Sequence, residues 1–196
     1  MNDLKFRLYN KLRTIIYPFD MLIERIPDRG SLLDVGCGYG TFCFILSNKR
    51  PNMKIVGIDM DRKRITTAKS KVTNQNLRFI CTDMTKYSND EKFDIVTCFD
   101  LIHHVDGKDH DLLITILKKL IKKNGILIIK DMNKKPAYKY IWNYLHDIAM
   151  TRSMKLNYLS IENMINLLEK NGLMIENVAD QSNALYAHYL IICRRL

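Results

Sequence analysis

The chain has 196 residues, of which 47% are hydrophobic and 27% charged, a balance typical of one globular domain. Its apolar runs are shorter than the roughly 20 residues that a membrane-spanning helix needs. The first ten residues lack the apolar core of a signal peptide, so we expect a cytoplasmic protein. The five cysteines form no Cys-x-x-Cys pair, which favours buried free thiols, and we expect no metal.

The net charge of +10 allows several partners. It fits binding to RNA, to an anionic membrane surface or to an acidic protein. The lysines are spread along the chain, however, and a solvated lysine-rich surface explains the same charge. We favour the solvated surface and keep nucleic acid as the less favoured partner.

Two helices are expected before the first strand. Residues 3–16 carry apolar side chains at spacings of three and four, which predicts an amphipathic helix with a basic polar side. Pro18 interrupts this pattern, and the apolar spacing from Phe19 to Ile26 predicts a second helix. A basic amphipathic helix can lie on a membrane, but packing on the domain beside the active site is the arrangement that we favour. Residues 1–28 would form a helical cap.

A glycine-rich turn follows the first predicted strand. Gly36, Gly38 and Gly40 alternate with other residues, and Asp34 precedes them by two positions. Glycine is required where a Cβ would block a tight turn and the approach of a ligand. A helix predicted from Thr41 would then direct backbone N–H groups toward that ligand. The Gly-x-Gly-x-Gly spacing differs from the Gly-x-Gly-x-x-Gly pattern of dinucleotide-binding proteins.

Acids also follow the next two predicted strands. Residues 54–59 are an apolar run that ends in Asp59, about twenty residues beyond the glycine turn, where an acid reaches a pair of ribose hydroxyls. A carboxylate suits this role because it accepts two hydrogen bonds at once. A helix over 61–73, capped by Asp61, leads to a strand over 77–81 and then to Asp83.

The rest of the chain continues the alternation of strands and helices. We expect strands over 93–99, 125–131, 173–178 and 186–193, and helices over 108–123 and 160–170. The longer helix would end at Asn124-Gly125. Short apolar strands that alternate with amphipathic helices predict an α/β fold with a doubly wound, mainly parallel sheet.

The motif over residues 34–40, the acids after the second and third strands, and the Phe-Asp-Ile-Val strand resemble class I S-adenosylmethionine (SAM)-dependent methyltransferases. The resemblance covers residues 30–196. It implies a Rossmann-like sheet of seven strands whose last strand is antiparallel. It also implies a single methyltransferase domain over 1–196. Within this domain, residues 30–131 would form the SAM-binding core, 132–158 a helical insertion on the substrate side, and 159–196 a C-terminal helix and strand pair.

The same resemblance implies SAM as cofactor and S-adenosylhomocysteine (SAH) as product. The glycine turn would hold the methionine portion, with Asp34 fixing the loop or the ammonium group. Asp59 would bind the ribose, and Asp83 and Met84 the adenine; a purely capping role is the alternative for Asp83. The cofactor candidates are Asp34, Gly36, Cys37, Gly38, Gly40, Asp59, Met60, Asp83, Met84 and Phe99.

His103 and His104 follow the fourth strand, close to where the resemblance places the transferred methyl group. An imidazole titrates near neutral pH and can accept a proton from a hydroxyl, so either histidine is a candidate general base. Packing against the cofactor or the strand is the alternative that we favour. The Phe99-Asp100 pair differs from the Pro-Pro-aromatic segment of enzymes that methylate adenine or glutamine amino groups.

The substrate side is expected over residues 136–150, which predict a helix that is apolar on two sides. One side would seat on the sheet while the other lines a substrate cavity; a helix buried entirely in the core is an equally weighted alternative. The substrate-binding candidates are Tyr17, Tyr138, Trp142 and His146.

Residues 17–20 and 130–143 are similar to small bacterial methyltransferases that accompany polyketide-like or aryl-polyene lipid assembly genes. This similarity implies an aromatic or acyl-chain-bearing acceptor that is methylated on oxygen. An amphiphilic or carrier-bound acceptor would fit the basic charge, because carrier proteins are acidic, and an anionic membrane surface is the other expected partner. An RNA-modifying methyltransferase and a non-catalytic SAM-binding regulatory protein stay open as alternatives. The sequence leaves the oligomeric state undefined.

Overall fold

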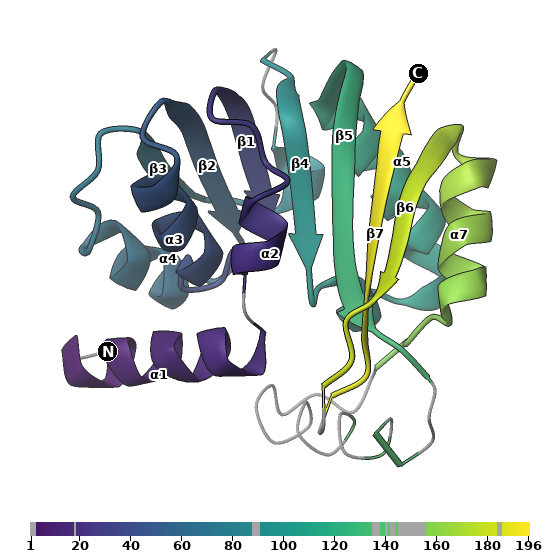
Figure 1. Cartoon of the computed structure of the whole chain (residues 1–196), viewed down its shortest axis with the longest axis horizontal. Coiled ribbons are helices and arrows are strands. Elements are labelled where there is room, and N and C mark those ends of the chain that lie inside the picture. Colours follow the sequence, from purple (N-terminus) through teal and green to yellow (C-terminus); the bar gives the residue numbers. More distant parts are fainter. Residues whose placement is uncertain are drawn as a thin grey trace. The chain divides into compact units, whose positions relative to one another are not determined.

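The computed structural model describes residues 3–17, 19–87, 91–134, 138, 139, 141, 144, 156–183 and 186–196. Seven strands form one sheet in the order β3-β2-β1-β4-β5-β7-β6. The last strand, β7, is antiparallel to both of its neighbours. This mainly parallel α/β sheet confirms the predicted fold class (Figure 1). The chain divides into two compact units, residues 1–89 and 90–196.

The first unit contains three parallel strands with helices between them. Its elements in chain order are α1 (Asp3–Ile16), α2 (Asp20–Ile23), β1 (Gly30–Val35), α3 (Thr41–Lys49), β2 (Met53–Asp59), α4 (Arg62–Lys69), β3 (Leu77–Cys81) and the 3-10 turn η1 (Met84–Lys86). β2 pairs with β1 and β3 in parallel register. The strands are nearly continuous apolar runs because parallel strands are covered on both faces, and Leu32, Leu33 and Ile55 are fully buried.

Two helices of this unit are shorter than the sequence predicts. α2 covers only four residues, Asp20–Ile23. The helix predicted over 61–73 ends at Lys69, although Asp61 caps it as expected by accepting hydrogen bonds from two backbone N–H groups. It ends early because the chain turns toward α3, where the Asn74 side chain donates to the Asn48 oxygen at 2.8 Å.

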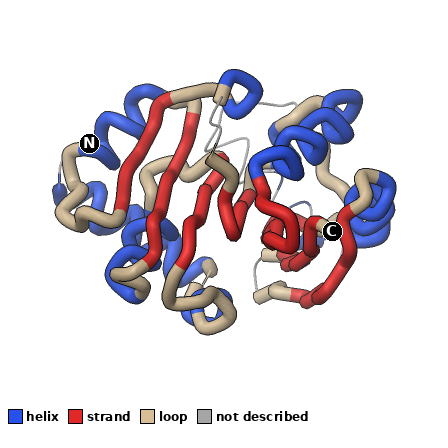
Figure 2. Tube along the Cα trace, turned by 90° about the horizontal axis from the view of Figure 1, so that it is seen from above, coloured by secondary structure: helices blue, strands red, loops and turns tan. Residues whose placement is uncertain are grey.

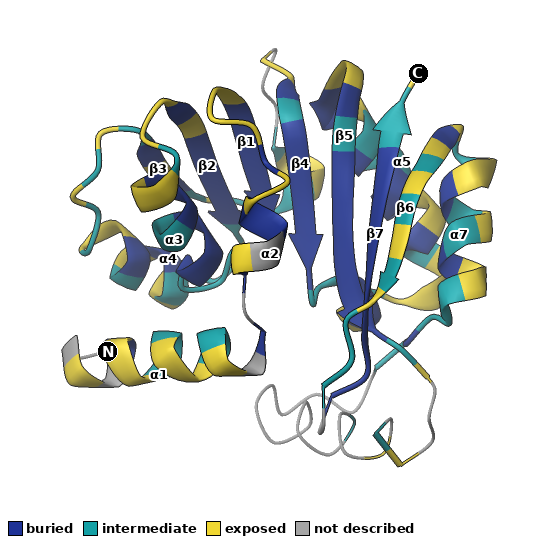
Figure 3. Ribbon diagram, in the orientation of Figure 1, coloured by how far each residue is buried: buried dark blue, intermediate teal, exposed yellow. Residues whose placement is uncertain are grey.

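The second unit contains the antiparallel strand. Its elements in chain order are β4 (Phe93–Phe99), the 3-10 turns η2 (Ile102–His104) and η3 (Gly107–Asp109), α5 (His110–Leu120), β5 (Ile121–Met132), α7 (Ile161–Lys170), β6 (Leu173–Asp180) and β7 (His188–Arg195). Figure 2 distinguishes the strands, drawn in red, from the helices in blue and the loops in tan. β4, β5 and β7 are buried over most of their length, whereas β6, at the edge of the sheet, alternates exposed and half-buried residues after the buried Leu173 (Figure 3).

The predicted boundary between α5 and β5 is wrong. The helix ends at Leu120 because Ile121 already pairs with Phe93 as the first residue of β5. The register then shifts between the first two pairs, and Asn124 takes a φ of 63° in the resulting bulge. Asparagine tolerates this left-handed conformation. Asn124-Gly125 therefore lies in a strand bulge and is not a helix stop. Glycine is needed at position 125 because a Cβ there would lie 2.8 Å from the Asp94 carbonyl oxygen.

Candidate active site

The glycine turn after β1 adopts the conformation that its sequence predicts. Gly36, Gly38 and Gly40 have φ values of 77°, 57° and 78°, which side chains rarely adopt. A Cβ on Gly40 would lie 2.3 Å from the Phe79 ring, so packing requires glycine there. A Cβ on Gly38 would meet no atom within 4 Å. The backbone at Gly38 is therefore open to close approach by a ligand, which fits a cofactor that lies against this turn.

Asp59 joins this turn to the end of β2. Its Oδ2 accepts a hydrogen bond from the Gly38 N–H at 2.9 Å, and its Oδ1 accepts one from the Asp61 N–H at 2.8 Å. A carboxylate oxygen can accept a second bond, so both oxygens retain acceptor capacity for ligand hydroxyls. Asp59 is half-buried at the carboxyl edge of the first unit, where open α/β sheets bind ligands.

Asp34 lies deeper in the unit than Asp59. It is 3% exposed, and Oδ2 accepts a hydrogen bond from the Cys43 thiol at 3.3 Å. Burial, followed by the charge of Asp34, raises the pKa of the Cys43 thiol well above its ordinary value. Burial and the charges of Asp34 and Asp59 do the same to the pKa of Cys37. Both thiols are therefore neutral near pH 7, and the Cys43 contact ties Asp34 on β1 to α3, the helix that follows the glycine turn.

Asp83 and Met84, which are expected around the adenine, belong to the same unit as Met60, another cofactor candidate. Asp83 Oδ1 accepts from the Thr85 N–H at 2.8 Å and from the Thr85 hydroxyl at 2.9 Å, and these bonds lower the pKa of Asp83. Oδ2 of Asp83 makes no hydrogen bond within the described part of the chain. Met60 is 75% exposed and Met84 half-buried, and both offer an adaptable apolar side chain.

The second unit brings one predicted histidine onto a carboxylate. His103 Nδ1 hydrogen-bonds to Asp131 Oδ1, and the His103 backbone N–H donates to Oδ2 at 3.2 Å. Asp131 thereby favours the tautomer with the proton on Nδ1, which leaves Nε2 as the basic nitrogen. The His103 ring, 1% exposed, stacks on Tyr158 with centroids 5.0 Å apart. The exposed His104 ring lies 4.0 Å from it.

A buried ion pair stands beside this histidine. Lys130 Nζ lies 2.6 and 2.7 Å from the two carboxylate oxygens of Asp100, and Lys130 is 1% exposed. Asp100 has a φ of 52°, and its N–H donates to the Lys130 carbonyl at 2.9 Å. Together these contacts fix the left-handed turn that carries the chain from β4 into η2.

Tyr189 lies on β7 directly opposite Asp131. Its hydroxyl is buried and has no hydrogen-bond partner among the residues that the structure describes. Burial, followed by the charge of Asp131, raises its pKa well above the ordinary tyrosine value. Tyr189 therefore keeps its proton near neutral pH.

Three of the remaining predicted residues lie in the described part of the chain. Phe99, the last residue of β4, is 7% exposed. Tyr17 is 5% exposed and packs on Phe19, with ring centroids 5.0 Å apart. Tyr138 is 67% exposed. Trp142 and His146 lie outside the described residues.

Sequence reasoning missed Asp131 and the Lys130–Asp100 pair. The available signal was the pair of charged residues that ends the apolar run 126–129 of β5. Charged side chains are almost never buried unless they are paired. Two consecutive charges at the end of an otherwise apolar strand therefore indicate partners elsewhere in the fold.

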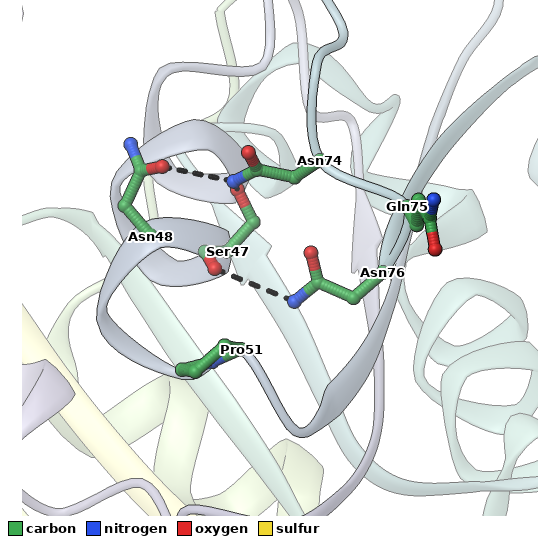
Figure 4. Close-up of a pocket in the computed structure, with 6 residues that line it drawn as sticks. All are labelled: Ser47, Asn48, Pro51, Asn74, Gln75 and Asn76. Carbon is green, nitrogen blue, oxygen red and sulfur yellow. Dashed lines mark hydrogen bonds between the residues drawn. The ribbon is translucent and has the colours of Figure 1, made fainter.

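A surface cavity of about 560 Å³ lies elsewhere on the first unit (Figure 4), lined by Ser47, Asn48, Pro51, Asn74, Gln75 and Asn76. The Asn76 amide donates to the carbonyls of Arg50 and Met53, both at 3.1 Å. These amides satisfy backbone groups where α3 ends, which is a structural role. The cavity lies where β2 and β3 begin, and the glycine turn lies where β1 ends.

Comparison with known proteins supports a family assignment. Residues 27–172 match the family model described as a methyltransferase domain. A ubiquinone biosynthesis O-methyltransferase of Rickettsia bellii is 30% identical over 165 residues, which cover 76% of this chain and 67% of the relative. The (S)-coclaurine N-methyltransferase of Papaver somniferum is 30% identical over 127 residues, which cover 62% of this chain and 36% of that relative. A malonyl-[acyl-carrier protein] O-methyltransferase of Ilyobacter polytropus is 27% identical over 154 residues, which cover 76% of this chain and 57% of that relative. The matched part of the chain thus spans about one third to two thirds of these relatives.

Solved structures share the fold over most or all of the chain's length. The magnesium protoporphyrin IX methyltransferase of Synechocystis, with bound SAH, has a TM-score of 0.73 at 19% identity, covering 100% of this chain and 88% of that one. The PH0226 protein of Pyrococcus horikoshii has a TM-score of 0.76 at 21% identity, and the match covers 94% of this chain and 91% of that protein. With a glycine turn open to a ligand, an acid at the end of β2 and a family model that matches most of its length, the chain belongs to the methyltransferase-domain family and has the fold of class I SAM-dependent methyltransferases.

Proposed function

We propose that this protein transfers a methyl group from SAM to an oxygen of a small-molecule acceptor that is aromatic or carries an acyl chain. The observation that carries the proposal is the open backbone at Gly38, held by the carboxylate of Asp59. The relatives include O-methyltransferases of ubiquinone biosynthesis and of malonyl-[acyl-carrier protein], which supports a free or carrier-bound small acceptor.

The cofactor would be held by residues of the first unit. When bound, SAM supplies a methyl group activated by its sulfonium. The backbone at Gly38 contacts the methionine portion, and Asp59 accepts hydrogen bonds from the ribose hydroxyls. Asp83 Oδ2 accepts from the adenine amino group while Met84 packs on the ring. Asp34 remains inside and fixes the loop.

The two histidines that follow β4 are the proposed proton acceptors. As the acceptor oxygen takes the methyl group, its hydroxyl proton passes to Nε2 of His103. Asp131 is the positioning residue: it holds the ring by Nδ1 and stabilises the imidazolium that forms. His104 is the second candidate, because its ring is exposed and lies beside that of His103.

Titration calorimetry with SAH tests the cofactor site. We expect wild-type protein to bind SAH and Asp59→Ala to bind at least about tenfold more weakly, because hydrogen bonds to a charged group contribute about 1.5–3 kcal/mol each. Asp20→Ala is the control, because Asp20 is an exposed acid of the same unit that pairs only with Lys49 among the described residues.

Folded wild-type protein that takes up no SAH would contradict the cofactor site, as would an Asp59→Ala variant that binds like the control. The acceptor is tested by incubation of labelled SAM with phenols and with acyl groups on carrier protein. Label transferred only to RNA would replace the proposed acceptor class. SAH binding without any transfer would indicate a regulatory SAM-binding protein.

A further inference from the structure

The outward side of α1 carries an apolar stripe of large aliphatic residues. Leu4, Leu8, Leu12 and Ile15 are 76%, 55%, 50% and 67% exposed. Spacings of three and four place the four side chains on one side of the helix. Figure 3 shows α1 as mostly exposed. A contiguous apolar patch that faces water marks a surface for an interaction.

The opposite side of α1 attaches the helix to its unit. Phe6 is 9% exposed and meets Phe44 edge-on, with ring centroids 5.8 Å apart. Tyr9 meets Tyr39 of the glycine turn with centroids 4.9 Å apart. The helix thus packs through a set of aromatic residues that excludes the leucine stripe. The stripe is therefore not needed for packing α1 onto its own unit.

Basic residues border the apolar stripe. Arg7 and Lys11 are exposed, lie one turn apart, and follow Leu4 and Leu8 at a spacing of three. α1 contains four basic residues and one acidic residue, within a chain of net charge +10. Long cationic side chains can extend along an apolar surface while their charged ends reach polar groups.

We infer that α1 docks this protein onto the surface of an anionic lipid bilayer. The leucine stripe enters the boundary between headgroups and acyl chains, and Arg7 and Lys11 contact lipid phosphates. A second copy of the chain fits less well, because a symmetric pair of stripes would bring the same cations together. No described helix is long and apolar enough to cross a membrane, so docking would be in the plane of the surface. This inference concerns a partner and does not rest on the proposed methyl transfer.

α1 is attached beside the glycine turn, so docking of α1 would also determine where this turn lies relative to the bilayer. Asn10 Oδ1 accepts a hydrogen bond from the hydroxyl of Thr41, the residue that follows the glycine turn. Docking would therefore bring the glycine turn close to the bilayer surface, where amphiphilic acceptors collect.

Co-sedimentation with lipid vesicles tests the inference. We expect wild-type protein to pellet with vesicles of phosphatidylcholine and phosphatidylglycerol and far less with phosphatidylcholine alone. The double variant Leu8→Glu/Leu12→Glu should partition at least about tenfold more weakly, because two leucines no longer enter the bilayer. The matched control is Leu112→Glu on α5, since Leu112 is 54% exposed and Leu8 55%. The charge variant Arg7→Glu/Lys11→Glu should lose the preference for anionic vesicles, and added salt should reduce it.

Circular dichroism and SAH titration of each variant separate this result from a folding defect or a failure of the cofactor site. The inference is overturned if wild-type protein ignores anionic vesicles, or if Leu8→Glu/Leu12→Glu partitions like Leu112→Glu. A dimer in light scattering that the double variant abolishes, without vesicle binding, would assign the stripe to a second copy. Binding to an acidic carrier protein without vesicle binding would likewise replace the bilayer.

Discussion

The Asp131 carboxylate contacts both the ring Nδ1 and the backbone N–H of His103, which lies 28 positions earlier in the chain. The orientation of the ring is therefore fixed by the neighbouring strand rather than by its own turn. A ring fixed in this way needs little reorganisation when it takes up a proton.

The proposed proton transfer predicts distinct effects at this pair. His103→Asn should lower kcat by about 100-fold or more, because a positioned base contributes about 10²–10⁴-fold. Asp131→Asn should lower kcat as well and move the rising limb of the pH profile to lower pH, because the imidazolium loses a neighbouring negative charge. Steady-state kinetics across pH, with SAH affinity as the control, measures both effects.

His104→Asn is the matched control for this prediction. A large loss of kcat in His104→Asn with little change in His103→Asn would assign the base to His104. An Asp131→Asn variant with a lowered kcat but an unmoved pH profile would give Asp131 a purely structural role.

Spacing along the chain predicts some site residues and not others. The glycine turn and Asp59 could be predicted because their relation depends on one strand-turn-helix unit and the next strand. The contact between His103 and Asp131 depends on the register of β4 against β5, which includes a bulge. No local pattern encodes that register, so the sequence indicated His103 without its partner.

At the scale of the elements, Gly38 and Gly40 occupy the same turn but should respond differently to substitution. Gly40→Ala places a Cβ into the Phe79 ring in a left-handed conformation, so we expect it to lower the free energy of unfolding by roughly 2–5 kcal/mol. Gly38→Ala carries only the backbone cost, roughly 1–2 kcal/mol. It should nevertheless weaken SAH binding at least about tenfold, because its Cβ points to the side that a ligand would occupy.

Urea denaturation and calorimetry on the two alanine variants separate stability from binding. Normal SAH affinity in Gly38→Ala would show that the ligand does not approach that side of the turn. Equal loss of stability in both variants would show that the Phe79 ring moves away from the added methyl group.

The predicted strands 77–81 and 93–99 match β3 and β4 because polar turn residues bound their apolar runs on both sides. Where α5 passes directly into β5 there is no such boundary, and periodicity alone extended the helix into the strand. The predicted helix over 136–150 lies largely outside the described residues and stays a prediction.

At the scale of the whole molecule, ligand binding should appear as increased thermal stability. SAH at 100 times its Kd should stabilise the folded state by about 2.7 kcal/mol, because it binds only that state. For a chain of this length that corresponds to a rise in Tm of roughly 5–10 °C, measured by scanning fluorimetry. At the same SAH concentration, a tenfold weaker affinity should limit the stabilisation of Asp59→Ala to about 1.4 kcal/mol, so its Tm should rise by about half as much as that of the wild type or less. An equal rise in both proteins would place SAH away from Asp59.

The position of β7 has a consequence for how the chain folds. β7 comes last in the sequence of the strands but lies between β5 and β6 in the sheet. β5 and β6 therefore cannot complete their pairing before residues 188–195 are available, whereas β1 to β3 can pair within residues 30–81. On a ribosome, the edges of β5 and β6 next to β7 would remain unpaired until late, and unpaired edges favour aggregation. Nascent chains would thus depend on rapid capture of β7, or on a chaperone, more than the small size of the protein suggests.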